Sequence, residues 1–425
     1  MWQNFWRKLK LIFRDPDLRK KLLFILGILA LFRVGAAIPI PGVNVERLAA
    51  FFSGNQFFGL LNIFTGGALE NLSIMMLGVG PYITASIIMQ LLTMIFPGLK
   101  AMYHEEGEAG RKKFNQYSRL LTVPLAILQG FGLLTLLARE GILGELTTIE
   151  RLINVLIVTA GSVLLMWLGE LISEYGIGNG ISVLIFAGIV AALPQAISRT
   201  FFTLDPSQIP IILGFVVAAI LIIAGVVIIT EGQRPVPVTY ARRIRGMKMY
   251  GGVSTYLPLR VNQAGVIPII FALSILLFPQ MIISFLSGIP SPIVQTISGA
   301  LLNFLNSPWI YAILYFTLVF LFTYFYTAVT FDPESISSNL QKSGAFIPGI
   351  RPGKNTAEFL YKIISRTTLM GALFLGAIAV LPLAMRAVTG IVTLTIGGTA
   401  LLIVVSVVLE TIKKIEAQIV MREYE

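Results

Sequence analysis

Side chains that could carry out acid–base or nucleophilic chemistry are scarce in this sequence. It contains no cysteine and a single histidine, His104, which lies in the charged stretch HEEGEAGRKK. Disulfides, thiolate metal sites and cysteine nucleophiles are therefore excluded, and a histidine metal site or a Ser-His relay is disfavoured. No phosphate loop of the form G-x-x-x-x-G-K-[ST] occurs. We expect a protein that is not an enzyme and that uses no cofactor.

Cationic side chains are the chemistry that the sequence does offer, and many of them lie in two long loops. Loop 231–263 contains VPVTYARRIRGMKMYGGVSTYLPL, where alternation around Val236 and Val238 predicts a β-hairpin. Loop 331–366 contains FIPGIRPGKNTAEFLYK, where the flanking prolines and glycines predict a turn that presents Arg351 outward. These arginines either serve topology and attraction to anionic lipid alone, or they dock an acidic partner or RNA phosphate.

The elements that must position these loops are membrane spans. Hydrophobic residues make up 56% of the 425 residues and charged residues only 12%, against about 25% charged in a soluble protein. A basic segment precedes the first apolar run, and Arg33 interrupts that run, which favours a retained span over a cleaved signal peptide. Ten runs are candidate spans, at 22–39, 72–96, 120–138, 152–168, 181–201, 209–230, 264–285, 305–330, 367–385 and 391–409.

The distribution of Lys and Arg predicts the orientation. Of the 32 basic residues, 26 lie before the first run, in segments 100–119, 231–263 and 331–366, or after residue 410. An even number of spans puts all of these segments on one side, and cytoplasmic loops carry the excess of Lys and Arg. We therefore expect a multi-pass protein of the cytoplasmic (inner) membrane with both termini in the cytoplasm.

Two similar interrupted segments divide the chain into halves. GVGPYI at 78–83 and GVIPII at 265–270 each interrupt the second span of a five-span group, and an odd number of spans inverts the second group relative to the first. The predicted fold is an all-α polytopic membrane protein in which ten transmembrane helices form two inverted five-helix halves, 1–203 and 204–425. Segment 57–69 is apolar but too short to span, and is expected to be a short helix in front of a broken span.

Apart from Arg33, the interiors of the runs carry no ionisable residue. Ion-coupled transporters usually need intramembrane carboxylates or histidines, whereas an apolar path suits a constriction that closes by excluding water. Val79 with Ile83, and Ile181 with Ile185, have the i, i+4 spacing that places each pair on one helix face. Ordinary helix packing would produce the same spacing. An inverted-repeat secondary transporter of a small solute therefore stays open as the alternative.

Several stretches in order carry a family resemblance: PIPGV (39–43), FTGGAL, PYITASIIMQLL, GIGNGIS, NQAGVIPIIFA, GAFIPGIRPG and GGTALLIVV. With them, nearly the whole chain resembles the SecY family, the channel subunits of the bacterial Sec protein translocase. The resemblance implies a protein-conducting channel that passes unfolded polypeptides and releases hydrophobic segments laterally into lipid. It also implies two halves hinged around a pore, with a plug helix and a lateral gate.

The resemblance implies site residues as well. The apolar pore ring would be Val79, Ile83, Ile181, Ile185, Ile270 and Ile403. The plug, within 57–69, would include Phe58, Leu60, Leu61, Ile63 and Phe64. The lateral gate would be Thr84, Ile87, Gln90 and Leu91 on one side, and Ile267, Phe271, Ile275 and Phe278 on the other. The positions expected to dock a partner are Arg242, Arg243, Arg245 and Arg351. The partners implied are small membrane subunits like SecE and SecG, the SecA motor, the ribosome, unfolded preproteins with a signal sequence, and the lipid bilayer.

Overall fold

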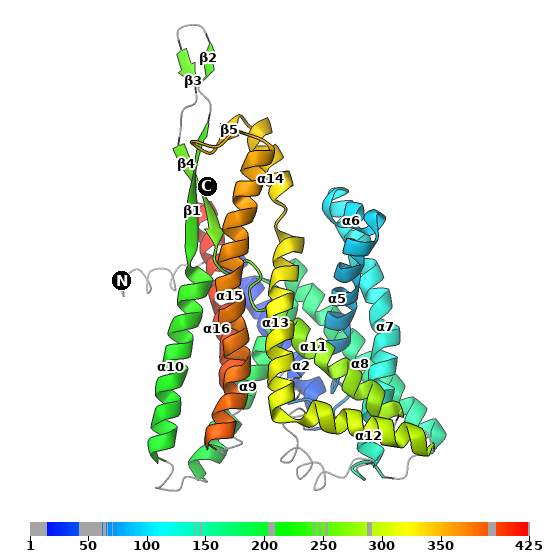
Figure 1. Cartoon of the computed structure of the whole chain (residues 1–425). Coiled ribbons are helices and arrows are strands. Elements are labelled where there is room, and N and C mark those ends of the chain that lie inside the picture. Colours follow the sequence, from blue (N-terminus) through cyan, green and yellow to red (C-terminus); the bar gives the residue numbers. More distant parts are fainter. Residues whose placement is uncertain are drawn as a thin grey trace.

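Helices make up most of the structure and lie side by side in one bundle (Figure 1). The computed structural model describes residues 15–41, 62, 65, 67–69, 71–139, 141–144, 147–202, 209–240, 243–245, 248–250, 254–286, 291–389 and 397–423.

Each of the ten predicted runs overlaps a helix. The first helix shows how local sequence defines a start, because the Asp15 carboxylate caps the backbone N–H groups of Asp17 and Leu18, and Pro16 occupies the first turn. The helices are α2 (Pro16–Ala37), α5 (Gly80–Ile95), α7 (Gly107–Arg139), α8 (Thr148–Tyr175), α9 (Gly180–Phe202), α10 (Ile209–Glu231), α11 (Ile267–Leu286), α13 (Pro308–Thr330), α15 (Lys354–Thr389) and α16 (Gly397–Glu423).

Length and hydropathy identify candidate membrane spans among the described residues. Within the described residues, four helices are sufficiently long and apolar, and they lie in α7, α8, α13 and α15. Apolar stretches also lie within α9 (Gly180–Pro194), α10 (Val216–Glu231) and α11 (Ile267–Leu276). The multi-pass helical architecture is therefore confirmed, and the count of ten spans stays a prediction.

The second run differs from the prediction. A span over 72–96 is expected from the sequence, but α5 begins only at Gly80, and residues 71–79 form turns. Gly78 has a φ of +58°, outside the range of a right-handed helix, and it delays the helix start. At the other end, α6 (Pro97–His104) bends away from α5 by 116°. His104, expected in a loop, is the last residue of α6.

A small sheet extends from one end of the bundle and confirms the predicted hairpin (Figure 1). Strand β1 (Gln233–Tyr240) pairs antiparallel with β4 (Ser254–Arg260), with Val236 opposite Leu257, and β5 (Ala345–Phe346) adds to the other edge of β1. At the tip, β2 (Arg243–Arg245) pairs with β3 (Lys248–Tyr250). Val236 and Val238 are each 2% exposed and pack in one cluster with Leu360 of α15.

The opposite end carries α12 (Pro292–Asn306), a helix that the sequence analysis does not predict. It lies across the base of the bundle in Figure 1. Ile293, Ile297, Leu301 and Phe304 follow a helical period and are all exposed. α14 (Pro333–Lys342), another helix beyond the predicted runs, follows α13 at the sheet end.

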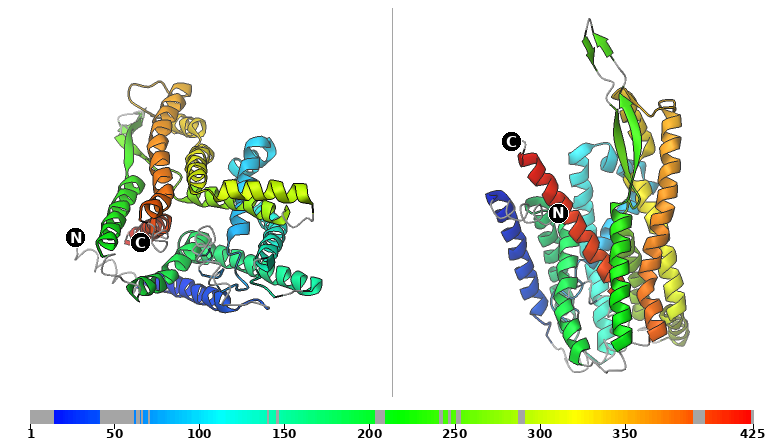
Figure 2. Two further views of the ribbon diagram at one scale, coloured as in Figure 1. Left: turned by 60° about the horizontal axis from the view of Figure 1, so that its bottom comes forward. Right: turned by 90° about the vertical axis from the view of Figure 1, so that its left-hand side faces the viewer.

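Contacts between helices fall into two groups. In the first group α5 packs against α7, α7 against α8, and both α2 and α9 against α8. In the second group α11 packs against α13, α13 against α15, and both α10 and α15 against α16. Across the groups, α11 packs against α5 and α7, and α9 packs against α16. The start of α2 and the end of α16 lie toward the same end as the sheet (Figure 2). The sheet, α6 and α14 lie toward that end as well. The elements that carry the basic segments therefore lie on one side of the bundle, as the distribution of Lys and Arg predicts.

Candidate functional site

The two interrupted segments adopt the same backbone geometry. Gly78 and Gly265 stand at equivalent positions of GVGPYI and GVIPII, with φ of +58° and +61°. Two residues later a helix begins in each case, α5 at Gly80 and α11 at Ile267. The N–H of Ile83 donates to the carbonyl of Val79, and the N–H of Ile270 donates to the carbonyl of Val266. From these starts α5 runs toward the sheet end and α11 toward α12 (Figure 1).

The six residues implied as a pore ring, which we call the waist, all belong to the large apolar core of the bundle or pack against it. Val79, Ile185, Ile270 and Ile403 are 8% exposed or less. Ile83 and Ile181 are half-buried and pack against them. The waist joins the starts of α5 and α11 to α9 and α16, so it draws side chains from both groups of helices. Its composition offers no charge and no strong hydrogen bond.

One waist residue also contacts a neighbouring helix. A Cβ added at Gly169 of α8 would collide with Cδ1 of Ile181. The absence of a side chain at 169 therefore lets α9 approach α8 closely at this level. Part of the surface of Ile181 is thus occupied by packing within the first group of helices.

Residues 71–79, which we call the anchored segment, lead into α5 without helical structure. Ile40 N donates to Leu72 O, and Ile74 N donates to Ile38 O, each at 2.9 Å, so the segment pairs with the chain after α2. Asn71 Nδ2 donates to Ala36 O at 3.3 Å. These bonds satisfy backbone groups that lipid could not satisfy.

The anchored segment also crosses α8 at two small residues. A Cβ at Gly161 would collide with the carbonyl oxygen of Ile74, so only glycine admits the segment at this distance. The next residue, Ser162, contributes a hydroxyl that faces the same segment. Leu72, Ser73 and Met76 are fully buried as a result. The four small residues 159–162 (TAGS), set between large apolar residues, are the sequence signal that could have revealed this crossing.

The plug residues Phe58, Leu60, Leu61, Ile63 and Phe64 lie outside the described residues. Of the neighbouring region, Thr65, Ala68 and Leu69 are described and buried. Thr65 Cγ2 lies 3.1 Å from where a Cβ on Gly78 would be, and Leu69 N donates to Thr65 Oγ1 at 3.3 Å. The C-terminal part of 57–69 therefore packs against the start of α5.

The helices that carry the lateral-gate residues touch one another. α11 packs against α5, α7 and α13. The ring of Phe271 is 5% exposed and meets Phe322 and Tyr326 of α13 edge to face, with centroids 6.0 and 6.1 Å apart. On α5, Ile87 is 1% exposed and Thr84 Oγ1 accepts a 3.5 Å hydrogen bond from Gln129 Nε2 of α7. In this structure α5, α7 and α11 are in contact.

The remaining gate residues are partly buried in the same region. Leu91, Ile267 and Ile275 pack against the cluster that contains the waist. Gln90 Nε2 donates to Ser86 Oγ within α5, and Gln90 Oε1 has no hydrogen-bond partner among the described residues. Phe278 lies on α11, and its side chain falls outside the described part of the chain.

Arg351 occupies the predicted turn. Gly349 and Gly353 have φ of +81° and +97°, and Thr356 Oγ1 donates to Arg351 O at 3.0 Å, which fixes the turn while the Arg351 side chain is exposed. Arg243 and Arg245 lie on β2, in the tip of the hairpin. Arg242 lies outside the described residues.

A charged cleft that the sequence analysis does not predict lies beside this turn. Its volume is about 990 Å³, and it extends from Lys100 of α6 to Glu334 of α14 and Lys354 and Glu358 of α15. The Asp332 carboxylate caps α14 and fixes one wall of the cleft. The acidic N-cap before PESISSNLQK was the available sequence signal for this helix.

Comparison with known proteins agrees with these features. The family model described as SecY matches residues 73–412. A relative from Mycobacterium bovis named "Protein translocase subunit SecY" is 44% identical, and the match covers 97% of each chain. Two solved structures share the fold at 20% identity. "The structure of a protein conducting channel" has a TM-score of 0.63, and "Sec61 in the Canine ribosome-channel complex from the endoplasmic reticulum" has a TM-score of 0.61. Each match covers 93% of this chain and 91% of the other. The chain belongs to the SecY family of protein translocase subunits.

Proposed function

We propose that this chain is a protein-conducting channel that passes unfolded polypeptides through the waist and releases hydrophobic segments into lipid between α5, α7 and α11. The observation that carries the proposal is the waist itself, six uncharged side chains that four helices from both groups contribute to the apolar core. The small-solute transporter explains interrupted helices but not the large basic loops, and family membership favours the channel.

An apolar waist suits a substrate without a fixed sequence. A passing chain meets no side chain that would hold it by a charge or a strong hydrogen bond, and flexible isoleucines close around side chains of different shape. When no substrate is present, the same side chains exclude water and limit ion leakage. The plug, predicted within 57–69, would complete this seal.

The gate follows from the contacts of α11. A signal segment that separates α11 from α5 and α7 would reach lipid, where transfer of its side chains is favourable by about 0.8 kcal/mol per buried CH₂. The equivalent Gly-containing starts of α5 and α11 support an inverted relation between halves 1–203 and 204–425. The backbone just before each of these starts lacks regular helix hydrogen bonds. It lies next to α5 and α11, the helices that would separate when the gate opens.

Energy for transport must come from outside the chain or from the membrane potential, because the sequence has no phosphate loop. We infer that the sheet-bearing end faces the cytoplasm of a bacterial inner membrane and docks a motor like SecA or the ribosome. The exposed Arg351 and the charged cleft beside it support such docking. Small membrane subunits like SecE and SecG are proposed to cover apolar helix surfaces.

Reconstitution distinguishes the two functions. Liposomes containing the chain and its copurifying subunits would be given a labelled preprotein with a motor and ATP, and in parallel a set of small solutes. We expect protease-protected preprotein and no concentrative solute uptake. Solute accumulation against a gradient, without preprotein protection, would favour the transporter.

A further inference from the structure

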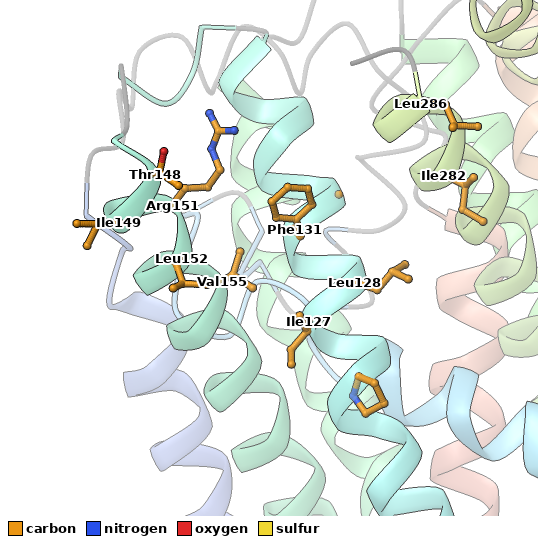
Figure 3. A pocket seen from close by; sticks show the side chains of 12 residues that line it. Ile127, Leu128, Phe131, Thr148, Ile149, Arg151, Leu152, Val155, Ile282 and Leu286 are labelled. Atoms are coloured by element: carbon orange, nitrogen blue, oxygen red, sulfur yellow. The ribbon is translucent and has the colours of Figure 1, made fainter. Parts of the chain in front are cut away.

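An apolar groove opens on the surface of the bundle between α7, α8 and α11 (Figure 3). Its volume is about 950 Å³, which lies in the range of roughly 300–1,000 Å³ found for small-molecule sites. Of the twelve residues that line it, ten are apolar, and the two polar ones are Thr148 and Arg151. The groove lies apart from the waist.

The walls of the groove are suited to hydrocarbon. Leu128 of α7 is 48% exposed and Leu152 of α8 is 61% exposed. Across from them, Ile282 and Leu286 of α11 form the opposite wall (Figure 3). Leaving these side chains in water would be unfavourable by about 25 cal/mol per Å². In a membrane protein such a surface is covered by acyl chains or by another apolar segment.

Arg151 adds a charge to this apolar surface. Its Nε is buried and has no hydrogen-bond partner among the described residues. Figure 3 shows its side chain extending from the first turn of α8 toward the end of α7. The adjacent Glu150 carboxylate is committed to the helix cap, where it accepts hydrogen bonds from N and Oγ1 of Thr147 at 2.8 and 2.9 Å. No carboxylate lies within 4 Å of Arg151 in the described structure, so its charge is available to a ligand.

The depth of Arg151 limits what that ligand can be. Its neighbours Ile149 and Leu152 are 71% and 61% exposed, so the apolar belt of α8 already begins at this turn. The turn lies toward the end of the bundle opposite the sheet (Figure 1). A guanidinium at the edge of an apolar belt extends toward the headgroup region. Lipid phosphates are the anions that the membrane supplies there.

We propose that this groove binds one anionic phospholipid, with its phosphate on Arg151 and an acyl chain along Leu128, Leu152 and Ile282. The planar guanidinium fork matches two phosphate oxygens. An apolar peptide helix in the same groove would cover the leucines and leave the guanidinium unpaired, which is unfavourable. The lipid would touch both α7 and α11, and so would bridge the contact between them.

Native mass spectrometry of the detergent-solubilised chain with its copurifying subunits tests the proposal. Phosphatidylglycerol and phosphatidylcholine with identical acyl chains would be titrated separately. We expect tighter binding of phosphatidylglycerol, an affinity at least fivefold lower in Arg151→Gln with loss of the headgroup preference, and an intermediate effect in Arg151→Lys, which keeps the charge and loses the fork. Arg234→Gln, on the exposed face of β1, is the matched control and should bind as the unaltered chain does.

The apolar half of the site has its own variant. Leu128→Trp places a ring in the groove and should weaken both lipids to a similar degree, since it blocks the acyl chain. The thermal unfolding midpoint of every variant would be measured to check that the fold is kept. Unchanged phosphatidylglycerol affinity in Arg151→Gln would overturn the proposal, as would unchanged binding in Leu128→Trp. Displacement of the lipid by a small membrane subunit, one for one, would identify the groove as a protein interface instead.

Discussion

Ser162 of α8 donates its hydroxyl hydrogen to the carbonyl of Gly78 at 3.0 Å, and both residues are buried. This bond ties a spanning helix to the residue whose positive φ sets the start of α5. It therefore fixes where Val79 and Ile83 enter the waist. The position of the waist depends on a side-chain hydrogen bond between segments 84 residues apart.

Ser162→Ala is expected to destabilise the protein by about 1–2 kcal/mol, because the buried Gly78 carbonyl loses its partner. The thermal unfolding midpoint in detergent measures this loss. Thr135→Ala removes a hydroxyl that bonds only within α7, to Phe131 O, and should have a smaller effect. Equal midpoints for the two variants would contradict the anchoring role of Ser162.

Gly161→Ala tests the crossing itself. The added Cβ would overlap the Ile74 carbonyl oxygen, which is backbone and cannot rotate away. We expect a larger loss of stability than in Ser162→Ala, together with ion leakage as the anchored segment shifts. Gly27→Ala on α2 is the matched control, since a Cβ at Gly27 meets no atom within 4 Å. Wild-type conductance and stability of Gly161→Ala would show that the crossing is loosely packed.

A polar substitution in the waist should let ions leak through the closed channel. Ile270→Asn or Ile403→Asn introduces an amide that holds water in a constriction, so we expect higher ion conductance in planar bilayers and export of preproteins with weaker signal sequences. Ile403→Val keeps the surface apolar and should leave conductance low. If the ion conductance of the asparagine variants stays low and preproteins with weaker signal sequences are still not exported, these residues do not form the seal.

The gate is tested by a crosslink, which the absence of native cysteine makes specific. Ile87→Cys with Phe271→Cys, or pairs of their neighbours, should form a disulfide between α5 and α11 and stop translocation until a reductant is added. Phe316→Cys with Gly376→Cys joins α13 to α15 within the second group, where a Cβ at 376 lies 2.8 Å from the Phe316 ring. That control should crosslink without blocking. Free transport through the locked Ile87–Phe271 pair would exclude this gate.

Periodicity and composition predict the parts of the fold that depend on local sequence. The apolar runs mark the helices, Val236 and Val238 mark the hairpin, and the proline and glycine around Arg351 mark its exposed turn. The sequence predicts that the anchored segment is part of a membrane span, because residues 72–79 are uncharged and mostly apolar. Its backbone bonds to residues near 38 and 162 are long-range, and no local pattern encodes them.

The sequence also does not predict which helices pack against one another. The ring residues implied by resemblance all belong to the apolar core or pack against it, but nothing in the spacing of Ile185 and Ile403 states that α9 and α16 touch. α12 was missed because Pro292, Gln295 and Ser298 lower its apolar content, while its exposed isoleucines follow a period that is clear only once a helix is assumed. The groove at Arg151 depends on three helices and had no sequence signal.

Docking at the sheet end gives the last prediction. Arg351 is exposed in a turn held by Gly349, Gly353 and the Thr356 hydroxyl, so reversing its charge should leave the fold intact. Arg351→Glu is expected to lower motor-driven preprotein transport at least tenfold, because a charge that attracts an acidic surface would now repel it. Lys20→Glu makes the same charge change on the exposed side of α2 and should have little effect. Pull-down of the motor and of ribosomes by each variant identifies which partner loses affinity. Full transport by Arg351→Glu, with unchanged binding of both, would place the docking surface elsewhere on the sheet or in the charged cleft.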